Sequence, residues 1–297
     1  MKKRTDFQKQ EERTAYLFLL PSIAGFLVFM AYPTVLGLLL SFTNTNNLHS
    51  PLNFIGLANF RRLLHDNYFL TSLKNNIFYM LTFTPIVVTV SLLFAIILNR
   101  NILCKKFFRT VFFFPFISSM VAVAIIWNYI LSPNGPLNSF LISLGMESPP
   151  GWLLSKNWAM FAVVVISVWK EFGFYMVILL AGLQTIPEYL YEAAVIDGAK
   201  PWQKFRHITL PMVSPTMFLC VIMAVINSFQ VFDLVNVLTE GGPGNATNVL
   251  VFRIYREGFA NVKLGYSSSI ALVLFIIVFV FSLIQFKFQD KWVKYNQ

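Results

Sequence analysis

The sequence is poor in charge. Only 12% of its 297 residues are Asp, Glu, Lys or Arg, about half the share found in an ordinary soluble domain. Hydrophobic residues make up 57%, and the mean hydropathy is +0.65. This composition excludes a disordered chain and an ordinary cytosolic enzyme. It leaves a protein that crosses a membrane several times.

Cysteine and histidine are scarce as well. The two cysteines, Cys104 and Cys220, cannot supply the disulfide framework of a small secreted domain, so we expect free thiols. The three histidines, His49, His65 and His207, are scattered without the spacing of metal ligands. We therefore expect no metal site in this chain.

Catalytic motifs are also missing. The sequence contains no phosphate-binding G-x-x-x-x-G-K-[ST] loop, no G-x-S-x-G and no H-E-x-x-H. Its acidic residues are mostly spread singly through the polar segments instead of gathering in one cluster. The missing motifs favour a transport protein over an enzyme. We therefore expect no enzyme activity and no cofactor bound by this chain.

Six stretches are long and apolar enough to cross a bilayer as helices, since a helix needs about 20 such residues. They predict an all-α, polytopic membrane protein with a single domain over residues 1–297. The first stretch continues well beyond the apolar part of a signal peptide, so it is read as an uncleaved span. The predicted spans are about 15–42, 75–98, 110–131, 158–184, 208–233 and 268–286.

The positive residues predict the orientation. The two termini and the loops 99–109 and 185–207 hold 15 Lys and Arg, whereas the alternate loops 43–74, 132–157 and 234–267 hold seven. Cytoplasmic loops carry the excess of Lys and Arg, so both termini are expected in the cytoplasm. Most of the net charge of +10 is thus a topology signal, and we expect no nucleic-acid partner.

The segment 185–207, between the fourth and fifth spans, carries the most specific pattern. Pro187 suits the first position of a helix, and Gly198 suits the left-handed residue that ends one. Pro201 can begin another helix, so the pattern predicts two short cytoplasmic helices joined at a bend. The small pair Ala193 and Ala194 would let another protein approach the first helix closely.

This segment resembles the signature loop of permease subunits of ATP-binding-cassette (ABC) importers, which pairs Glu-Ala-Ala with a following Gly and a Leu-Pro. The matching residues are Glu192, Ala193, Ala194, Asp197, Gly198, Ile208, Leu210 and Pro211. The flanking stretches 180–187, 227–233 and 238–244 look like the maltose and glycerol-3-phosphate branch of that family. The resemblance covers nearly the whole chain and is most specific over 169–244.

The resemblance implies a type I ABC importer permease fold in a bacterial cell membrane. It implies that segment 185–207 docks on a cytoplasmic ATPase, which alone would use ATP and Mg²⁺. It further implies two ATPase copies, a second homologous permease, an extracytoplasmic solute-binding protein and a carbohydrate substrate. The residues expected to couple to the ATPase are Glu192, Ala193, Ala194, Asp197, Gly198, Leu210 and Pro211.

Polar residues inside the spans are candidates for the substrate path, because such groups usually face a cavity or a partner. Lys170 and Glu171 lie in the fourth span, and Asn227, Gln230 and Asp233 lie in the fifth. Helical spacing would place Asn227 and Gln230 on one face, where amides and aromatic rings suit a sugar. The alternative for each is a structural role, as an ion pair or as polar contacts between helices.

Three other functions remain as alternatives. A permease of the same superfamily for a non-sugar solute fits the sequence nearly as well. A stand-alone secondary transporter would call for acidic relays or broken helices in matching halves, which the sequence does not display. A membrane enzyme would need a catalytic cluster. The particular sugar and the identity of the partner subunits are not encoded in any motif.

Overall fold

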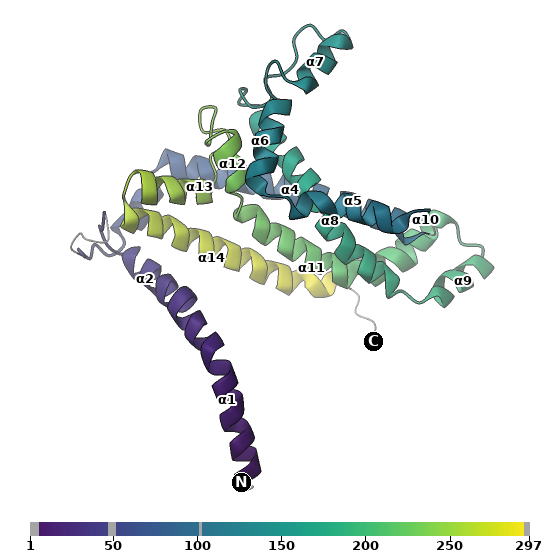
Figure 1. Ribbon diagram of the computed structural model, residues 1–297, viewed down its shortest axis with the longest axis horizontal. Helices are drawn as coiled ribbons and strands as arrows, with labels where there is room; N and C mark the ends of the chain where they lie inside the picture. The colour runs from purple at the N-terminus through teal and green to yellow at the C-terminus, as the bar shows by residue number, and fades with distance from the viewer. Residues whose placement is uncertain (1–5, 47–51, 101–102, 294–297) are drawn as a thin grey trace. The chain divides into compact units, whose positions relative to one another are not determined.

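The computed structural model describes residues 6–46, 52–100 and 103–293. Within these residues the chain is nearly all helical, and the only strand-like pairing is an isolated bridge between Thr43 and Phe54. Five helices are long and apolar enough to cross a membrane, and the number rises to six when the bent pair α5 and α6 is counted as one span. The predicted all-α fold with six spans is confirmed (Figure 1).

The chain divides into two compact units, residues 1–63 with 254–272 and residues 64–253 with 273–297. The first unit contains the long apolar helix 11–40, which combines α1, a π-helical turn and α2. Its elements are α1 (Asp6–Phe26), the π-helical turn Leu27–Ala31, α2 (Tyr32–Leu40), α3 (Ala58–Leu63), the π-helical turn Arg256–Ala260 and the start of α14 (Leu264–Phe288).

Hydrogen bonds hold the chain beyond α2 in the first unit. The buried Asn59 amide donates to the carbonyl oxygens of Ser41 and Thr43 at 3.0 and 2.9 Å. The backbone N–H of Gly265 donates to the Thr45 carbonyl at 2.8 Å. These bonds satisfy backbone groups that would otherwise lack partners where the helix ends, so α14 begins beside the end of α2.

The second unit contains the remaining spans and their connections. Its helices are α4 (Asn67–Asn99), α5 (Lys105–Ile117), α6 (Met120–Ile130), α7 (Pro136–Ser143), α8 (Ala159–Gln184), α9 (Glu188–Ile196), α10 (Pro201–Lys204), the π-helical turn Phe205–Thr209, α11 (Leu210–Phe229), α12 (Asp233–Leu238), most of α13 (Leu250–Tyr255) and the rest of α14, which is followed by a short 3₁₀ turn, Gln289–Lys291.

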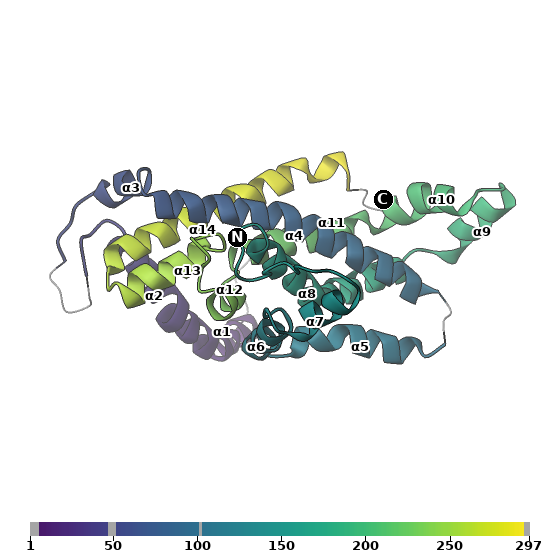
Figure 2. The same ribbon diagram turned by 90° about the horizontal axis from the view of Figure 1, so that it is seen from above.

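Helix α8 lies at the centre of this unit and packs against α4, α5 and α11 (Figures 1 and 2). Small and hydroxyl side chains allow the close approach, as is common between membrane helices. Ser91 on α4 donates to the Phe172 carbonyl at 2.8 Å. A Cβ added at Gly173 would collide with the Phe112 carbonyl of α5. The large apolar side chains Phe83, Tyr175 and Phe229 fill the remaining space.

The third span differs from the single helix predicted over 110–131. It consists of α5 and α6, which meet at an angle of 95°. Pro115 removes a backbone donor near the end of α5, and Ser118 and Ser119 are extended or non-helical at the break. The carbonyl oxygens freed there are satisfied from another helix, as described below.

The fifth span also differs from the sequence prediction. The span was predicted over 208–233, with a second short cytoplasmic helix beginning at Pro201. Instead the helix runs without interruption from Pro201 to Phe229, because a π-helical turn at 205–209 joins α10 to α11. The helix then stops at Gln230, and α12 begins separately at Asp233.

Candidate functional site

The helix α9 projects from the second unit between α8 and α10 (Figures 1 and 2). It begins at Glu188, one residue later than expected, because Pro187 adopts an extended conformation and serves as the N-cap. No residue of α9 is buried. The predicted coupling residues Glu192, Ala193 and Asp197 are exposed, so α9 presents a surface that the described chain leaves uncovered.

A complete C-terminal cap fixes the end of α9. Gly198 has the predicted left-handed backbone, with φ +74°. Its N–H donates to the Val195 carbonyl at 3.0 Å, and the N–H of Ala199 donates to the Ala194 carbonyl at 2.8 Å. This pair of bonds is the Schellman motif, in which a left-handed residue closes a helix. Gly198 therefore holds a defined bend.

After the bend, two contacts tie the segment to the fifth span. The Lys200 N–H donates to Oε1 of Gln203 at 2.7 Å and so caps the start of α10. The hydroxyls of Tyr191 on α9 and Thr209 lie 2.9 Å apart in a hydrogen bond. The predicted coupling residues Leu210 and Pro211 continue directly into α11. The exposed helix is thus connected to the membrane helix by a side-chain bond as well as by the chain.

Several exposed apolar side chains on this segment were not singled out from the sequence. Ile196 is 87% exposed, and Tyr189, Val195 and Trp202 are also largely exposed. Apolar residues on a helix of nine residues, too short to cross a membrane, would normally be buried against the rest of the chain. A cluster of this kind is typical of a protein interaction surface. The sequence did contain the pattern that indicates this surface, namely apolar residues inside the otherwise polar segment 185–207.

A second candidate site is a cavity of about 180 Å³ within the membrane helices of the second unit. It brings together four of the five residues predicted for the substrate path. They are Glu171, Asn227, Gln230 and Asp233. The remaining lining residues are Tyr79, Met120, Ser167, Val231, Phe232 and Leu234. We refer to this site as the membrane cavity.

The convergence does not arise from a single continuous helix, as was predicted for Asn227 and Gln230. Asn227 lies in the last turn of α11, Gln230 is its C-cap, and Asp233 opens α12. The break at 230–232 turns these side chains toward the cavity from two helices instead of one. Tyr175 adds a contact that the sequence did not indicate, because its hydroxyl accepts a hydrogen bond from Asn227 at 3.1 Å.

Lys170 is the predicted path residue that does not line the membrane cavity. Its side chain is buried and points to the break between α5 and α6. There its ammonium donates to the carbonyl oxygens of Pro115, Phe116 and Ser118 at 3.0, 3.1 and 2.8 Å. A cation suits these oxygens because they carry the negative end of the helix dipole. The geometry gives Lys170 a structural role at the bend.

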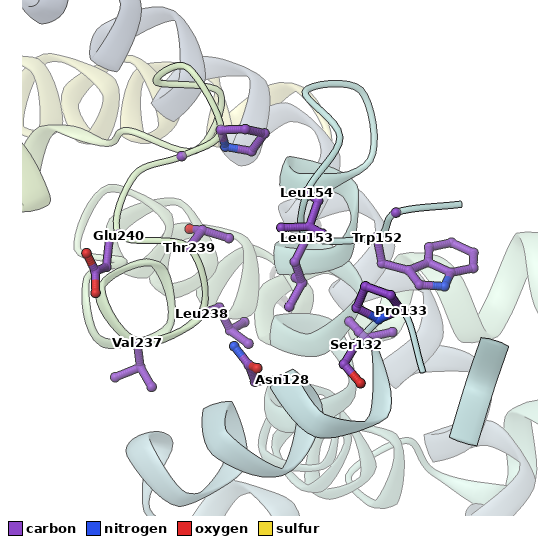
Figure 3. A pocket seen from close by; sticks show the side chains of 14 residues that line it. Asn128, Ser132, Pro133, Trp152, Leu153, Leu154, Val237, Leu238, Thr239 and Glu240 are labelled. Atoms are coloured by element: carbon purple, nitrogen blue, oxygen red, sulfur yellow. The ribbon is translucent and has the colours of Figure 1, made fainter. Parts of the chain in front are cut away.

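A larger cavity of about 430 Å³ lies among the loops of the second unit. Figure 3 shows that its walls come from the end of α6, the loop before α8 and the turn after α12. Most of the lining is apolar, with Leu131, Leu153 and Leu238 among its residues. Asn128, Ser132 and Glu240 add polar groups. We refer to this site as the loop cavity.

The turn after α12 has an ordered internal structure. Glu240, Gly241, Gly244 and Asn245 all have positive φ angles. Thr247 stabilises the turn, since its hydroxyl donates to the Gly242 carbonyl at 2.8 Å and lies 2.7 Å from the Thr239 hydroxyl. The turn residues seen in the sequence therefore form a compact, hydrogen-bonded loop.

Comparisons with known proteins agree with this architecture. The chain is 35% identical over 285 residues to the sn-glycerol-3-phosphate transport system permease protein UgpA of Yersinia enterocolitica, covering 95% of each chain. It is 34% identical over 288 residues to the lactose transport system permease protein LacF of Rhizobium radiobacter, covering 95% of this chain and 96% of LacF.

A solved structure of a bacterial alginate ABC transporter, in complex with an alginate pentasaccharide-bound periplasmic protein, contains a chain of the same fold. Its TM-score is 0.84 at 24% identity, and the match covers 99% of this chain and all of that chain. The family model described as the binding-protein-dependent transport system inner membrane component matches residues 69–294. The chain belongs to this family of ABC importer permeases.

Proposed function

We propose that this permease carries a carbohydrate or a related polyol through the membrane and couples that movement to ATP hydrolysis on a separate subunit. The observation that carries the proposal is the exposed helix α9, which is closed by Gly198 and continuous with the fifth span. The lactose and glycerol-3-phosphate permeases among its relatives support a carbohydrate or polyol substrate.

The proposed assembly contains a second homologous permease, two copies of a cytoplasmic ATPase and an extracytoplasmic solute-binding protein. Each permease would supply half of the pathway. The membrane cavity supports this arrangement, because its volume of about 180 Å³ is below the range of about 300–1,000 Å³ that is usual for ligand pockets. A second subunit would complete it.

In the proposed cycle, the ATPase binds α9 through Ile196, Tyr189 and the small residues Ala193 and Ala194. Closure of the ATPase dimer would move α9, and the bond between Tyr191 and Thr209 would pass the movement to the fifth span. The helix from Pro201 to Phe229 has 29 residues and is about 43 Å long at 1.5 Å per residue. Its far end carries Asn227 in the membrane cavity, so the helix that follows α9 reaches from the proposed docking segment to the proposed substrate contact.

The proposal places the whole chain, as one permease domain, in a bacterial cell membrane with both termini in the cytoplasm. Lys2, Lys3 and Arg4, which contribute to that orientation, lie outside the described residues. The chain would make no covalent change to its substrate. ATP and Mg²⁺ would be bound only by the ATPase subunits, and no metal or cofactor is assigned to this chain.

The test is an Ile196→Asp variant, reconstituted with the partner permease, ATPase and binding protein in proteoliposomes. A charge on the exposed face of α9 should cut ATP-driven uptake at least tenfold and weaken copurification of the ATPase, while the chain still folds. Leu144→Asp is the matched control, because Leu144 is also exposed but lies outside α9. Full uptake by the Ile196→Asp assembly would refute the proposed docking surface.

A further inference from the structure

The membrane cavity is lined by acidic side chains but, among its described lining residues, by no basic ones. Its lining contains the two carboxyl groups of Glu171 and Asp233 and the two amides of Asn227 and Gln230. No Lys, Arg or His is among its described lining residues. Carboxylates accept hydrogen bonds from hydroxyl groups, and amides both accept and donate them, but neither group neutralises an anion.

The nearest candidate for a compensating cation in the sequence is Lys170, next to Glu171. Its ammonium is held by three carbonyl oxygens at the break between α5 and α6. Moving it into the cavity would leave those oxygens without a donor, and an unpaired carbonyl oxygen away from water is unfavourable. The Lys170 ammonium is therefore held at the break between α5 and α6 and does not bind a substrate in the cavity.

We infer that this permease selects its substrate by charge: it passes neutral or positively charged saccharides and excludes acidic ones. The inference rests on the proposed function and names the substrate class of the same cavity. An anion entering the cavity would lose water without gaining a cationic partner from this subunit, and it would face the carboxyl groups of Glu171 and Asp233. A neutral hydroxyl group would meet hydrogen-bond partners on either side.

The inference separates this chain from some of its relatives. Glycerol 3-phosphate is a phosphate ester, and the alginate transporter imports an acidic polysaccharide, whereas lactose is neutral. The inference therefore groups this chain with the lactose permease by the charge of the substrate. The discrimination would act at the membrane, in addition to any selection by the binding protein.

The first experiment uses proteoliposomes that contain the complete transporter and its binding protein. They are supplied with oligosaccharide digests of three charge classes: neutral starch and galactan, acidic alginate and pectin, and basic chitosan. The saccharides that accumulate with ATP are identified by mass spectrometry. We expect only neutral or amino oligosaccharides inside. Accumulation of a uronate oligosaccharide would overturn the charge inference but leave the proposed function intact, whereas no accumulation of any saccharide would refute the proposed function itself.

The second experiment tests whether the cavity causes the exclusion. The accumulated saccharide is oxidised at its primary hydroxyls to the corresponding uronate, and both forms are titrated by equilibrium dialysis against the transporter without binding protein. The wild type should bind the uronate at least tenfold more weakly. Glu171→Gln and Asp233→Asn should each narrow this gap to about threefold, while Glu147→Gln, outside the cavity, should not. Equal binding of both forms by the wild type, or an unchanged gap in both cavity variants, would overturn the inference.

Discussion

Two membrane helices of similar length and hydropathy differ in how much of them the described chain covers. In the helix 11–40, 0% of the most apolar 18-residue window is buried, whereas in α8 the value is 67%. Apolar sequence alone does not distinguish the two. The difference shows that α8 is the structural centre of its own unit, whereas the elements of the first unit leave the apolar side chains of the helix 11–40 uncovered.

A pair of glycine substitutions should give the largest difference between these helices. Gly173→Leu in α8 would force a side chain into the Phe112 carbonyl, whereas Gly25 has no atom within 4 Å of an added Cβ. We expect Gly173→Leu to cost about 3 kcal/mol or more and to abolish folded protein. Gly25→Leu should leave the thermal midpoint of the purified chain within about 2 °C of the wild type. Similar thermal unfolding curves for the two variants would show that the burial of α8 does not determine whether it accepts a larger side chain.

The next effect concerns the bend that α8 stabilises. Lys170→Met keeps the length of the side chain but removes three hydrogen bonds to the break in the third span. We expect a loss of about 2–4 kcal/mol, measured by denaturation in mild detergent, together with reduced uptake. Lys74→Met is the control, since Lys74 is an exposed lysine of α4. Equal stability of the two variants would rule out the structural role of Lys170.

The next prediction tests whether an exposed position, Gly198, tolerates a larger side chain. Nothing lies within 4 Å of a Cβ added there, yet its φ of +74° strains a side chain. Gly198→Val should cost about 1–2 kcal/mol locally and should uncouple ATP hydrolysis from uptake by changing the bend after α9. Gly198→Asn should retain most of the coupling, because Asn adopts the left-handed region more readily. The ratio of sugar transported to ATP hydrolysed measures the effect, and normal coupling in Gly198→Val would exclude a role for the bend.

The smallest expected effect is in the first helix. Phe18 is 81% exposed, whereas Phe83 of α4 is fully buried. Phe18→Ala should change the unfolding free energy of the isolated chain by less than about 0.5 kcal/mol. Phe83→Ala should cost about 3–5 kcal/mol, because it leaves a cavity in the core. The comparison is made by thermal unfolding of the two purified variants in the same detergent. A large loss of unfolding free energy in Phe18→Ala would mean that other residues of the same chain cover the first helix.

Local sequence predicted some of these features well. The conformation at Gly198 depends only on nearby residues, and a glycine after a helix is enough to indicate it. The apolar length of the spans likewise predicted six crossings. The break at Pro115 was visible as a proline, but its stabilising partner, Lys170, is more than 50 residues away, so no local pattern could assign it.

For the membrane cavity, the sequence predicted the residues but not their geometry. The residues Glu171, Asn227, Gln230 and Asp233 were proposed for the path, and the structure brings them to one cavity. The geometry expected for them was wrong, since it assumed one continuous helix through 233. Helix α11 ends at Phe229 and α12 begins after it. Apolar periodicity continues across this break, so it gave no sign of the separate helix.

The ordered turn after α12 has a consequence for the rate at which a soluble partner could associate with this face. Its left-handed residues and the hydrogen bonds of Thr239 and Thr247 already restrict the backbone before any partner arrives. A loop ordered in advance loses little conformational entropy on association. Productive encounters would then depend on orientation and diffusion, and not on waiting for the loop to fold.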